Sequence, residues 1–342
     1  MYFFKISDII WAEVKILKKI VFFNKTLLSG GIEKCIETLS RYIHKDYELE
    51  ICYYDDSKLD MNIVNILGQY AKITKVDENT VVDCDVCIWC YLYFDYKEMK
   101  KLINAKEYIC WIHSMPRILP DCLLDDMDFV NDCSRFICVS EAVKTNLNIS
   151  KEGEVIHNFI NDNIMELANE SNPLEHNMDK LKLCVVSRLS NGKGFDRLLR
   201  LVEKLEEKNV DYILNIIGKG RTMEDEIKEW FSPYNNVHFI GYRDNPYNYV
   251  KNSDYLIQLS DDESWCNSIT EAKTLGVPVI VTKFLSAKEQ VVDGYNGLLV
   301  ELDCDDYDTV VTRMVEFNQV LKDNLKDFVY EPEVNKWLEV LK

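Results

Sequence analysis

Residues 260–282 read SDDESWCNSITEAKTLGVPVIVT and predict one strand–helix–strand unit of an α/β fold. The apolar run DYLIQLS at 254–260 precedes an acidic loop and is typical of a buried strand. A helix is expected to begin near Asn267 and to stop at Gly276, because glycine readily adopts the backbone conformation that ends a helix. The run VPVIVT at 277–282 follows at once as the next strand. This order favours a parallel sheet covered by helices.

The same alternation continues on both sides of this unit. A first series of strands runs from IVFFN at 20–24 to SRFICVS at 134–140, and a second begins with LKLCVVS at 181–187. Because 342 residues exceed one ordinary core, we expect two Rossmann-like α/β domains. The predicted parts are an N-terminal domain over 1–160, a polar linker over 161–180, a C-terminal domain over 181–325 and a closing helical segment over 326–342 that packs back on the N-terminal domain.

Charge excludes one class of partner. The chain has 40 Lys and Arg against 58 Asp and Glu, a net charge of −18, which argues against nucleic acid as the main partner. Any phosphate site must therefore be a local cationic pocket. The twelve cysteines occur without a recognisable signal peptide, which favours a reduced compartment and a cytoplasmic location.

Three cysteines, Cys84, Cys87 and Cys90, overlap as two C-x-x-C units within VVDCDVCIWCY. This run is typical of a strand, where residues three apart point to opposite faces and cannot share one metal ion. We interpret them as buried thiols, and we expect no metal site and no cofactor in the protein.

The first segment, residues 1–19, places apolar residues on one helical stripe with lysines interspersed. Its charged residues interrupt the apolar run well short of the roughly 20 residues that a membrane-spanning helix needs. The pattern suits a helix packed on its own domain, which we favour, or a helix lying on the cytoplasmic membrane face.

Two glutamates flank the start of the predicted helix near Asn267. With Glu263 in the loop and Glu271 in the first turns, the helix N-terminus lies between them, and its unpaired N–H groups suit a diphosphate. Two alternatives stay open. Ser268 and Glu271 have the spacing of a capping box, and Glu263 fits a solvated acidic loop equally well.

Three further groups of residues are candidates for ligand binding or catalysis. The loop of VVSRLSNGKGF places the cations Arg188 and Lys193 where they could hold a diphosphate, or merely face solvent. The pair Gly30 and Gly31 opens a helix, either beside a ligand or as a plain tight turn. His113 ends the apolar run YICWIH, a place where a lone histidine is usually structural.

Taken together and in order, these motifs resemble the family-4 retaining glycosyltransferases of the GT-B fold. The resemblance rests on SGGIE, on His113 at a strand end, on VSE at 139–141, on VIHNFIN at 155–161, on SRLSNGKG, IIGKG and FIGY, and on E-x7-E followed by EAKTLGVPVIVT. It covers nearly the whole chain. It implies two Rossmann-like domains facing across a cleft, with a nucleotide-sugar donor held mainly by the second.

The resemblance also implies roles for individual residues. Catalytic roles would fall to Glu263 at the transferred sugar, to His113 at its outer hydroxyls, and to Arg188 and Lys193 at the diphosphate. Donor binding would use the ribose-binding Glu271 together with Gly30, Gly31, Gly218, Gly220, Ser264, Trp265, Cys266, Asn267 and Ser268. The family often has glycine where Ser264 stands, and this departure bears on which sugar is transferred.

The implied activity is transfer of a hexosyl group, with retention, from a nucleotide sugar to a saccharide or lipid-linked saccharide in the synthesis of a bacterial-type surface polysaccharide. A UDP-sugar is the favoured donor, and no metal is expected to be required. Two rivals remain: a nucleotide-sugar epimerase on the same scaffold and a non-catalytic nucleotide-binding module. An NAD-dependent oxidoreductase is disfavoured, because GKGRTM has Met223 where the dinucleotide fingerprint requires glycine.

Overall fold

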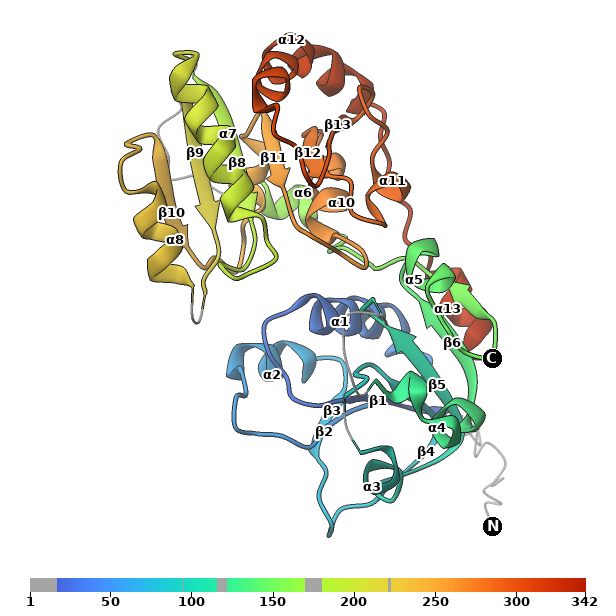
Figure 1. Ribbon diagram of the computed structural model, residues 1–342. Helices are drawn as coiled ribbons and strands as arrows, with labels where there is room; N and C mark the ends of the chain where they lie inside the picture. Colours follow the sequence, from blue (N-terminus) through green and yellow to red (C-terminus); the bar gives the residue numbers. More distant parts are fainter. Residues whose placement is uncertain (1–16, 94, 116–121, 170–179, 221–222) are drawn as a thin grey trace, which may run out of the picture.

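The computed structural model describes residues 17–93, 95–115, 122–169, 180–220 and 223–342. They form two parallel sheets, each flanked by helices, in two lobes stacked one above the other (Figure 1). The expected α/β fold with two Rossmann-like domains is confirmed. Of the stripe predicted over residues 1–19, positions 1–16 lie outside the described residues, and Lys19 already begins the first strand.

The N-terminal sheet has seven strands in the order β3-β2-β1-β4-β5-β6-β7. Its strands are β1 (Lys19–Asn24), β2 (Glu48–Tyr53), β3 (Lys72–Lys75), β4 (Val82–Trp89), β5 (Ile103–Ile112), β6 (Cys133–Cys138) and β7 (Gly153–Val155). Its helices are α1 (Gly31–Ile43), α2 (Met61–Leu67), α3 (Tyr96–Lys100), the 3-10 turn η2 (Leu123–Asp125), α4 (Met127–Asp132) and α5 (Glu141–Thr145). Central strands such as β1 are buried on both faces, which explains their unbroken apolar sequence.

The C-terminal sheet has six strands in the order β10-β9-β8-β11-β12-β13. Its strands are β8 (Leu181–Val186), β9 (Tyr212–Ile217), β10 (Val237–Gly241), β11 (Tyr255–Gln258), β12 (Val279–Thr282) and β13 (Gly297–Val300). Its helices are α6 (Ile164–Leu167), α7 (Phe195–Glu207), α8 (Glu224–Phe231), α9 (Tyr247–Lys251), α10 (Asn267–Thr274), α11 (Ala287–Gln290) and α12 (Tyr307–Leu325).

Strand order reverses once in each sheet, between β1 and β4 in the first and between β8 and β11 in the second. In open parallel sheets, ligands bind outside the carboxyl ends of the strands at such a reversal, because the flanking helices diverge there and leave a crevice. The loops that follow these four strands are therefore where a ligand site is expected.

The end of the chain crosses back to the N-terminal domain. Helix α13 (Val334–Val340) contributes Trp337 to the N-terminal core, where its ring lies 4.7 Å from that of Trp111, centroid to centroid. A difference from the sequence prediction concerns the linker over 161–180. It contains α6, and both Ile164 of this helix and Ala168, which directly follows it, pack in the C-terminal core.

The cysteines of the C-x-x-C units are buried thiols, as expected. Cys84 and Cys87 lie in β4 and Cys90 follows it, and burial raises the pKa of Cys84 to about 12. In the described part of the chain, no three His, Cys, Asp or Glu residues gather as they would around a metal ion. None of the helices within the described ranges is long and apolar enough to cross a membrane.

Candidate active site

Two glycines deliver Lys193 to the carboxyl edge of the C-terminal sheet. Gly192 and Gly194 have φ values of +77° and +71°, which side chains rarely tolerate. A Cβ on Gly194 would lie 1.8 Å from the carbonyl oxygen of Leu259, and the carbonyl of Gly192 accepts from the N–H of Asp261 at 2.9 Å. The loop after β8 is therefore pressed onto the end of β11.

This contact brings Lys193 to Glu263. Lys193 Nζ donates to Glu263 Oε1 at 2.6 Å, and the same oxygen accepts from Ser260 Oγ at 2.9 Å and from Gln258 Nε2 at 3.2 Å. The side chains of Lys193 and Glu263 are 18% and 17% exposed. The alternatives of a solvated acidic loop for Glu263 and a solvated cation for Lys193 are wrong. Oε2 of Glu263 has no hydrogen-bond partner among the described residues.

Helix α10 begins at Asn267 as predicted, but Ser268 does not cap it. The residue before the helix is Cys266, no side chain caps the N-terminus, and Ser268 Oγ lies 3.1 Å from Cys266 Sγ. The capping-box interpretation of Ser268 and Glu271 is wrong, since the helix starts one residue before Ser268. The first turn of α10 carries no acidic residue, so its positive end is open to an anion.

The loop Ser264–Ser268 offers fewer backbone donors than the family resemblance implies. Cys266 N–H donates to Gln290 Oε1 at 3.1 Å and is therefore not available to a ligand here. The N–H groups of Asn267 and Ser268 have no acceptor among the described residues. The ring of Trp265 packs against the N-terminal core and is only partly exposed, so it contributes to the domain interface.

Glu271 lies in the second turn of α10 and is 6% exposed. Tyr247 Oη donates to its Oε1 at 3.2 Å, and Lys34 Nζ from α1 of the other domain approaches the same atom at 4.0 Å. A carboxylate can accept about four hydrogen bonds. With one hydroxyl donor in place, the buried carboxylate of Glu271 can still accept hydrogen bonds from further donors, such as the two hydroxyls of a ribose. Neither Tyr247 nor Lys34 was indicated by the sequence motifs.

Arg188 follows β8 and is exposed, without a side-chain hydrogen bond or ion pair to any described residue. Burial raises the pKa of Glu33, in α1 of the N-terminal domain, to about 7, and the charge of Arg188 is one of several smaller effects that lower it.

The side chain of Glu33 lies at the start of its own helix, beside Gly30. Glu33 Oε1 accepts from Asn24 Nδ2 at 3.2 Å and from Leu28 N–H at 3.4 Å, and a Cβ on Gly30 would lie 2.8 Å from its Oε2. The carboxyl group occupies the N-terminal end of α1, where an anion would otherwise bind. The sequence motifs did not indicate Glu33, although its place three residues after Gly30 is typical of a residue that caps its own helix.

Gly31 lies where the two domains approach each other. A Cβ on Gly31 would lie 3.9 Å from Asn267 Nδ2, and the same amide nitrogen is 3.9 Å from Cys35 Sγ. The N-termini of α1 and α10 therefore meet across the cleft. Because Glu33 already sits at the α1 terminus, the α10 terminus is the one available to an anion.

Gly218 and Gly220 hold the ends of β8 and β9 together. A Cβ on Gly218 would lie 1.8 Å from the Ser187 carbonyl oxygen, and one on Gly220 2.3 Å from that of Leu189. Both glycines thus serve close backbone packing at the edge of the site. Between them, Lys219 Nζ lies 4.7 Å from the ring centroid of Tyr242.

His113 follows β5 at the carboxyl edge of the N-terminal sheet. Burial lowers the pKa of His113 to about 3, so its imidazole stays neutral at physiological pH. Its Nε2 is buried and has no hydrogen-bond partner among the described residues. The ring lies 4.4 Å from that of Trp111, centroid to centroid. The Nε2 of a neutral imidazole can donate a hydrogen bond to a ligand hydroxyl or accept one from it, depending on the tautomer.

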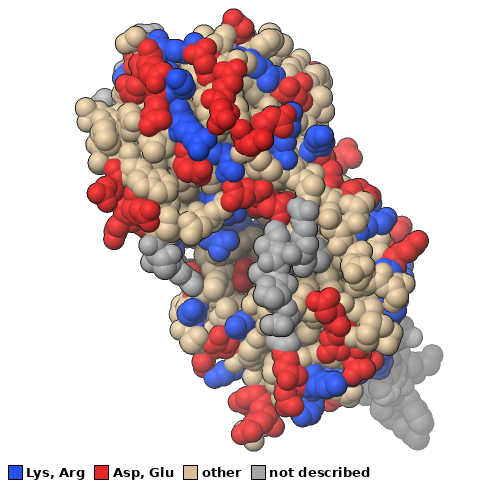
Figure 2. All heavy atoms as spheres, in the orientation of Figure 1, with Lys and Arg blue, Asp and Glu red and all other residues tan. Residues whose placement is uncertain are grey.

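The space-filling view shows a hollow between the two lobes, with both basic and acidic atoms inside it (Figure 2). Acidic and basic side chains are also mixed elsewhere on this face. The hollow lies where the two lobes face each other in Figure 1.

Two parallel-sheet domains facing each other in this way define the GT-B class of fold. The structure of HepE from Anabaena in complex with UDP and glucose superposes with a TM-score of 0.72 at 16% identity, covering 90% of this chain and 94% of that one. The lipopolysaccharide outer core galactosyltransferase WaaB superposes with a TM-score of 0.66 at 16% identity, covering 94% and 99%. The predicted GT-B fold is confirmed.

Part of the chain matches a known family. The matched residues are 168–325, and the family is described as glycosyl transferases group 1. These residues include Arg188, Lys193, Glu263 and Glu271.

Relatives differ in how much of the chain they match. An uncharacterized glycosyltransferase of Methanocaldococcus jannaschii is 27% identical over 57% of this chain, and the chain covers 53% of that protein. The Campylobacter jejuni N-acetylgalactosamine-N,N'-diacetylbacillosaminyl-diphospho-undecaprenol 4-alpha-N-acetylgalactosaminyltransferase is 24% identical over 84% of this chain and 87% of its own length. The Escherichia coli O-antigen biosynthesis glycosyltransferase WbnH is 34% identical over 36% of this chain and 35% of its own length.

Proposed function

We propose that the protein is a retaining glycosyltransferase that moves a hexosyl group from a nucleotide sugar to a saccharide or lipid-linked saccharide during polysaccharide synthesis. The observation that carries the proposal is the pairing of Lys193 with Glu263 beside the uncapped N-terminus of α10. A cation and helix N–H groups suit a diphosphate, and a carboxylate a few residues away suits sugar hydroxyls.

The donor would lie along the carboxyl edge of the C-terminal sheet. Its diphosphate would contact Lys193, Arg188 and the free N–H groups at the start of α10. Its ribose hydroxyls would donate to Glu271, which Tyr247 orients. The transferred sugar would donate to Oε2 of Glu263. A uridine base is favoured, and the binding of UDP by HepE supports this choice.

Transfer breaks the bond between the anomeric carbon and the diphosphate oxygen, whose electron pair stays with the leaving nucleoside diphosphate. Lys193, Arg188 and the α10 N-terminus would stabilise the charge that develops there. The acceptor oxygen forms the new bond on the same face of the sugar, and its proton goes to a leaving phosphate oxygen. A double displacement with Glu263 as nucleophile is the less favoured route.

An acceptor would use the opposite edge of the cleft, where the order of the N-terminal strands reverses. Lys25 follows β1 there, and its Nζ lies 5.9 Å from the ring centroid of Tyr91, which follows β4. The ring of Tyr93 lies 5.5 Å from that of Tyr91. Aromatic rings cover the apolar faces of sugars, and a lysine suits a phosphate. This arrangement supports a phosphate-bearing saccharide, and the lipid-linked saccharide named for the C. jejuni relative is of that class.

The test is a binding panel followed by a transfer assay. A thermal-shift series with UDP, GDP, dTDP and their sugars identifies the donor, because a ligand of the native state raises stability by RT ln(1 + [L]/Kd). Release of free nucleoside diphosphate that depends on acceptor supports transfer. Conversion of one nucleotide sugar into its epimer, or binding without turnover, would support the rival functions. We propose that no metal is required, so transfer should persist in EDTA.

A further inference from the structure

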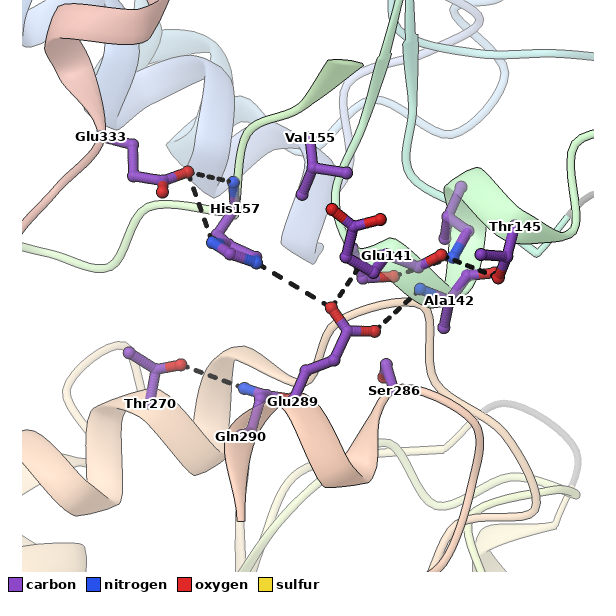
Figure 3. A network of polar contacts seen from close by, with 12 residues as sticks. Glu141, Ala142, Thr145, Val155, His157, Thr270, Ser286, Glu289, Gln290 and Glu333 are labelled. Atoms are coloured by element: carbon purple, nitrogen blue, oxygen red, sulfur yellow. Dashed lines mark hydrogen bonds and ion pairs between the residues drawn. The ribbon is translucent and has the colours of Figure 1, made fainter. Parts of the chain in front are cut away.

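His157 lies between two carboxylates that come from different parts of the chain. The residue follows β7, and its Nδ1 is 3.3 Å from Glu333 Oε2 in the segment before α13 (Figure 3). Its backbone N–H donates to the same oxygen at 2.9 Å. On the other side, its Nε2 is 3.9 Å from Glu289 Oε2 in α11. The imidazole is therefore held where the N-terminal domain, the returning C-terminal segment and the C-terminal domain meet.

Glu289 also joins the two domains directly. Its Oε2 accepts from Glu141 N–H and its Oε1 from Ala142 N–H, both at 2.8 Å (Figure 3). Both donors lie in the first turn of α5, whose N–H groups have no partner within the helix. A carboxylate of the C-terminal domain thus satisfies a helix end of the N-terminal domain. This contact fixes where α11 sits relative to His157.

The third neighbour of His157 is Trp265, from the loop that begins at Glu263. The two rings lie 4.3 Å apart, centroid to centroid, with 30° between their planes. The same loop is also held by Gln290, which follows Glu289 in α11. Its side chain accepts from Cys266 N–H at 3.1 Å and donates to Cys266 carbonyl oxygen at 2.9 Å.

We propose that His157 is a positioning residue, which sets the place of the loop Ser264–Ser268 through Trp265. The imidazole itself would not contact the donor, yet it forms the surface on which Trp265 of the loop rests. Loosening this contact would move the backbone between Glu263 and the start of α10, where the transferred sugar would bind. The nucleoside part of the donor would be held elsewhere, by Glu271. The inference rests on the proposed function for this last consequence only.

Hydrogen exchange tests the positioning without any ligand. In the full chain, we expect His157→Ala to raise amide exchange at Cys266 and Ile269 by about tenfold, because their hydrogen bonds open more often when the loop loosens. His157→Phe keeps an aromatic surface for Trp265 and should restore most of the protection. The exposed His238 of β10 provides the matched control, and His238→Ala should leave this loop unchanged.

Unchanged exchange in His157→Ala would overturn the proposal. If amide exchange rises as much in His157→Phe as in His157→Ala, ring stacking on Trp265 does not hold the loop. If His157→Ala does not fold, amide exchange is measured on Trp265→Ala and Trp265→Phe instead. The proposal then requires that protection of the loop is lost in Trp265→Ala and kept in Trp265→Phe.

A kinetic readout separates positioning from general destabilisation. With the donor found in the binding panel, we expect His157→Ala to lower kcat by about tenfold or more, since small displacements of reacting groups cost that much. The affinity for uridine, which lacks the diphosphate that the loop would contact, should change less than about twofold. A parallel loss of uridine affinity would contradict a role confined to the loop. A wild-type protein that neither binds UDP nor transfers sugar would refute the proposed function, while hydrogen exchange would still decide the role of His157.

Discussion

Lys193 Nζ lies 2.6 Å from Glu263 Oε1, although the two residues are 70 positions apart in the sequence. The contact joins the loops after β8 and β11, the two strands between which the sheet order reverses. One residue would serve the leaving diphosphate and the other the transferred sugar. Their pairing means that a change at either residue disturbs both functions.

The first prediction concerns this pair. Lys193→Ala and Glu263→Ala should each lower kcat/KM for transfer by roughly 100-fold or more, since each removes a preorganised group from the charge-separating step. The double variant should lose little beyond either single one, because the residues act as a unit. Circular dichroism should show an intact fold. Lys283→Ala removes an exposed ion pair with Glu301 and is the control. Near-wild-type activity in either single variant would refute the assignment.

A second prediction concerns Gly194, which lets the loop that carries Lys193 pack closely against Leu259. Gly194→Ala should lower the free energy of unfolding by about 2–4 kcal/mol, because it adds a clash with Leu259 to an unfavourable φ. Gly276→Ala is the matched control, since Gly276 has φ +73° but no heavy atom within 4 Å of its Cβ position. It should cost only about 1 kcal/mol. Equal losses in urea denaturation would show that the close approach contributes nothing.

The third prediction concerns Glu271. If its carboxylate accepts from ribose hydroxyls, Glu271→Gln should weaken UDP binding by roughly 10-fold or more, because hydrogen bonds to charged groups contribute about 1.5–3 kcal/mol. Tyr247→Phe removes only the hydroxyl that orients the carboxylate and should weaken binding less. Calorimetric titration with UDP measures both variants. Unchanged affinity in Glu271→Gln would leave Glu271 a purely structural contact with Tyr247.

The fourth prediction is a pH dependence caused by Glu33. Burial raises the pKa of this carboxyl to about 7 from an ordinary value of 4.5, so the folded protein binds its proton more tightly than the unfolded chain. Its stabilising contribution is present below pH 4.5 and is lost as the pH rises from there to about 7. Glu33→Gln should therefore be more stable than wild type at pH 8, by on the order of 2 kcal/mol, and nearly equal at low pH. Urea denaturation at both pH values measures this, with the exposed Glu48→Gln as control. If the stability difference between Glu33→Gln and wild type is the same at both pH values, the pKa of Glu33 is not raised.

The fifth prediction concerns the return of the chain to the N-terminal domain. Trp337→Ala should lower the stability of that domain by about 3–5 kcal/mol, the usual cost of deleting a buried tryptophan side chain. Amide exchange should rise in β5, which carries Trp111, and should remain unchanged in β8. Glu339→Ala, on the exposed face of α13, is the control. Equal loosening of both sheets would show that α13 supports the whole molecule rather than one domain.

Local pattern predicted most of the secondary structure. Buried parallel strands read as unbroken apolar runs, and each is followed by a helix with an apolar stripe, so alternation alone indicates two sheets of this class. The predicted strands at 20–24, 181–187 and 277–282 correspond to β1, β8 and β12. The linker was less predictable. Its few apolar residues, Ile164 among them, form too short a pattern to distinguish α6 from a loop.

The local sequence pattern did not predict which side chains contact each other in the site. Ser268 and Glu271 have the spacing of a capping box, but the helix starts before Ser268, and Glu271 meets Tyr247 instead. Trp265 lies in a loop assigned to the donor, but its ring rests on His157 of the other domain. Both outcomes depend on residues distant in sequence, which spacing does not reveal.

The sequence by itself determined the two-domain α/β architecture and the residue types at the strand ends, because these follow from short-range periodicity and from the fixed direction of parallel strands. Only the tertiary structure decided which of these residues meet. Lys193 reaches Glu263 because Gly194 allows a backbone approach that no side chain would permit. His157 reaches Trp265 because Glu289 and Glu333 hold it at the domain interface. Such contacts depend on packing between segments far apart in the chain, and packing is a property of the whole fold.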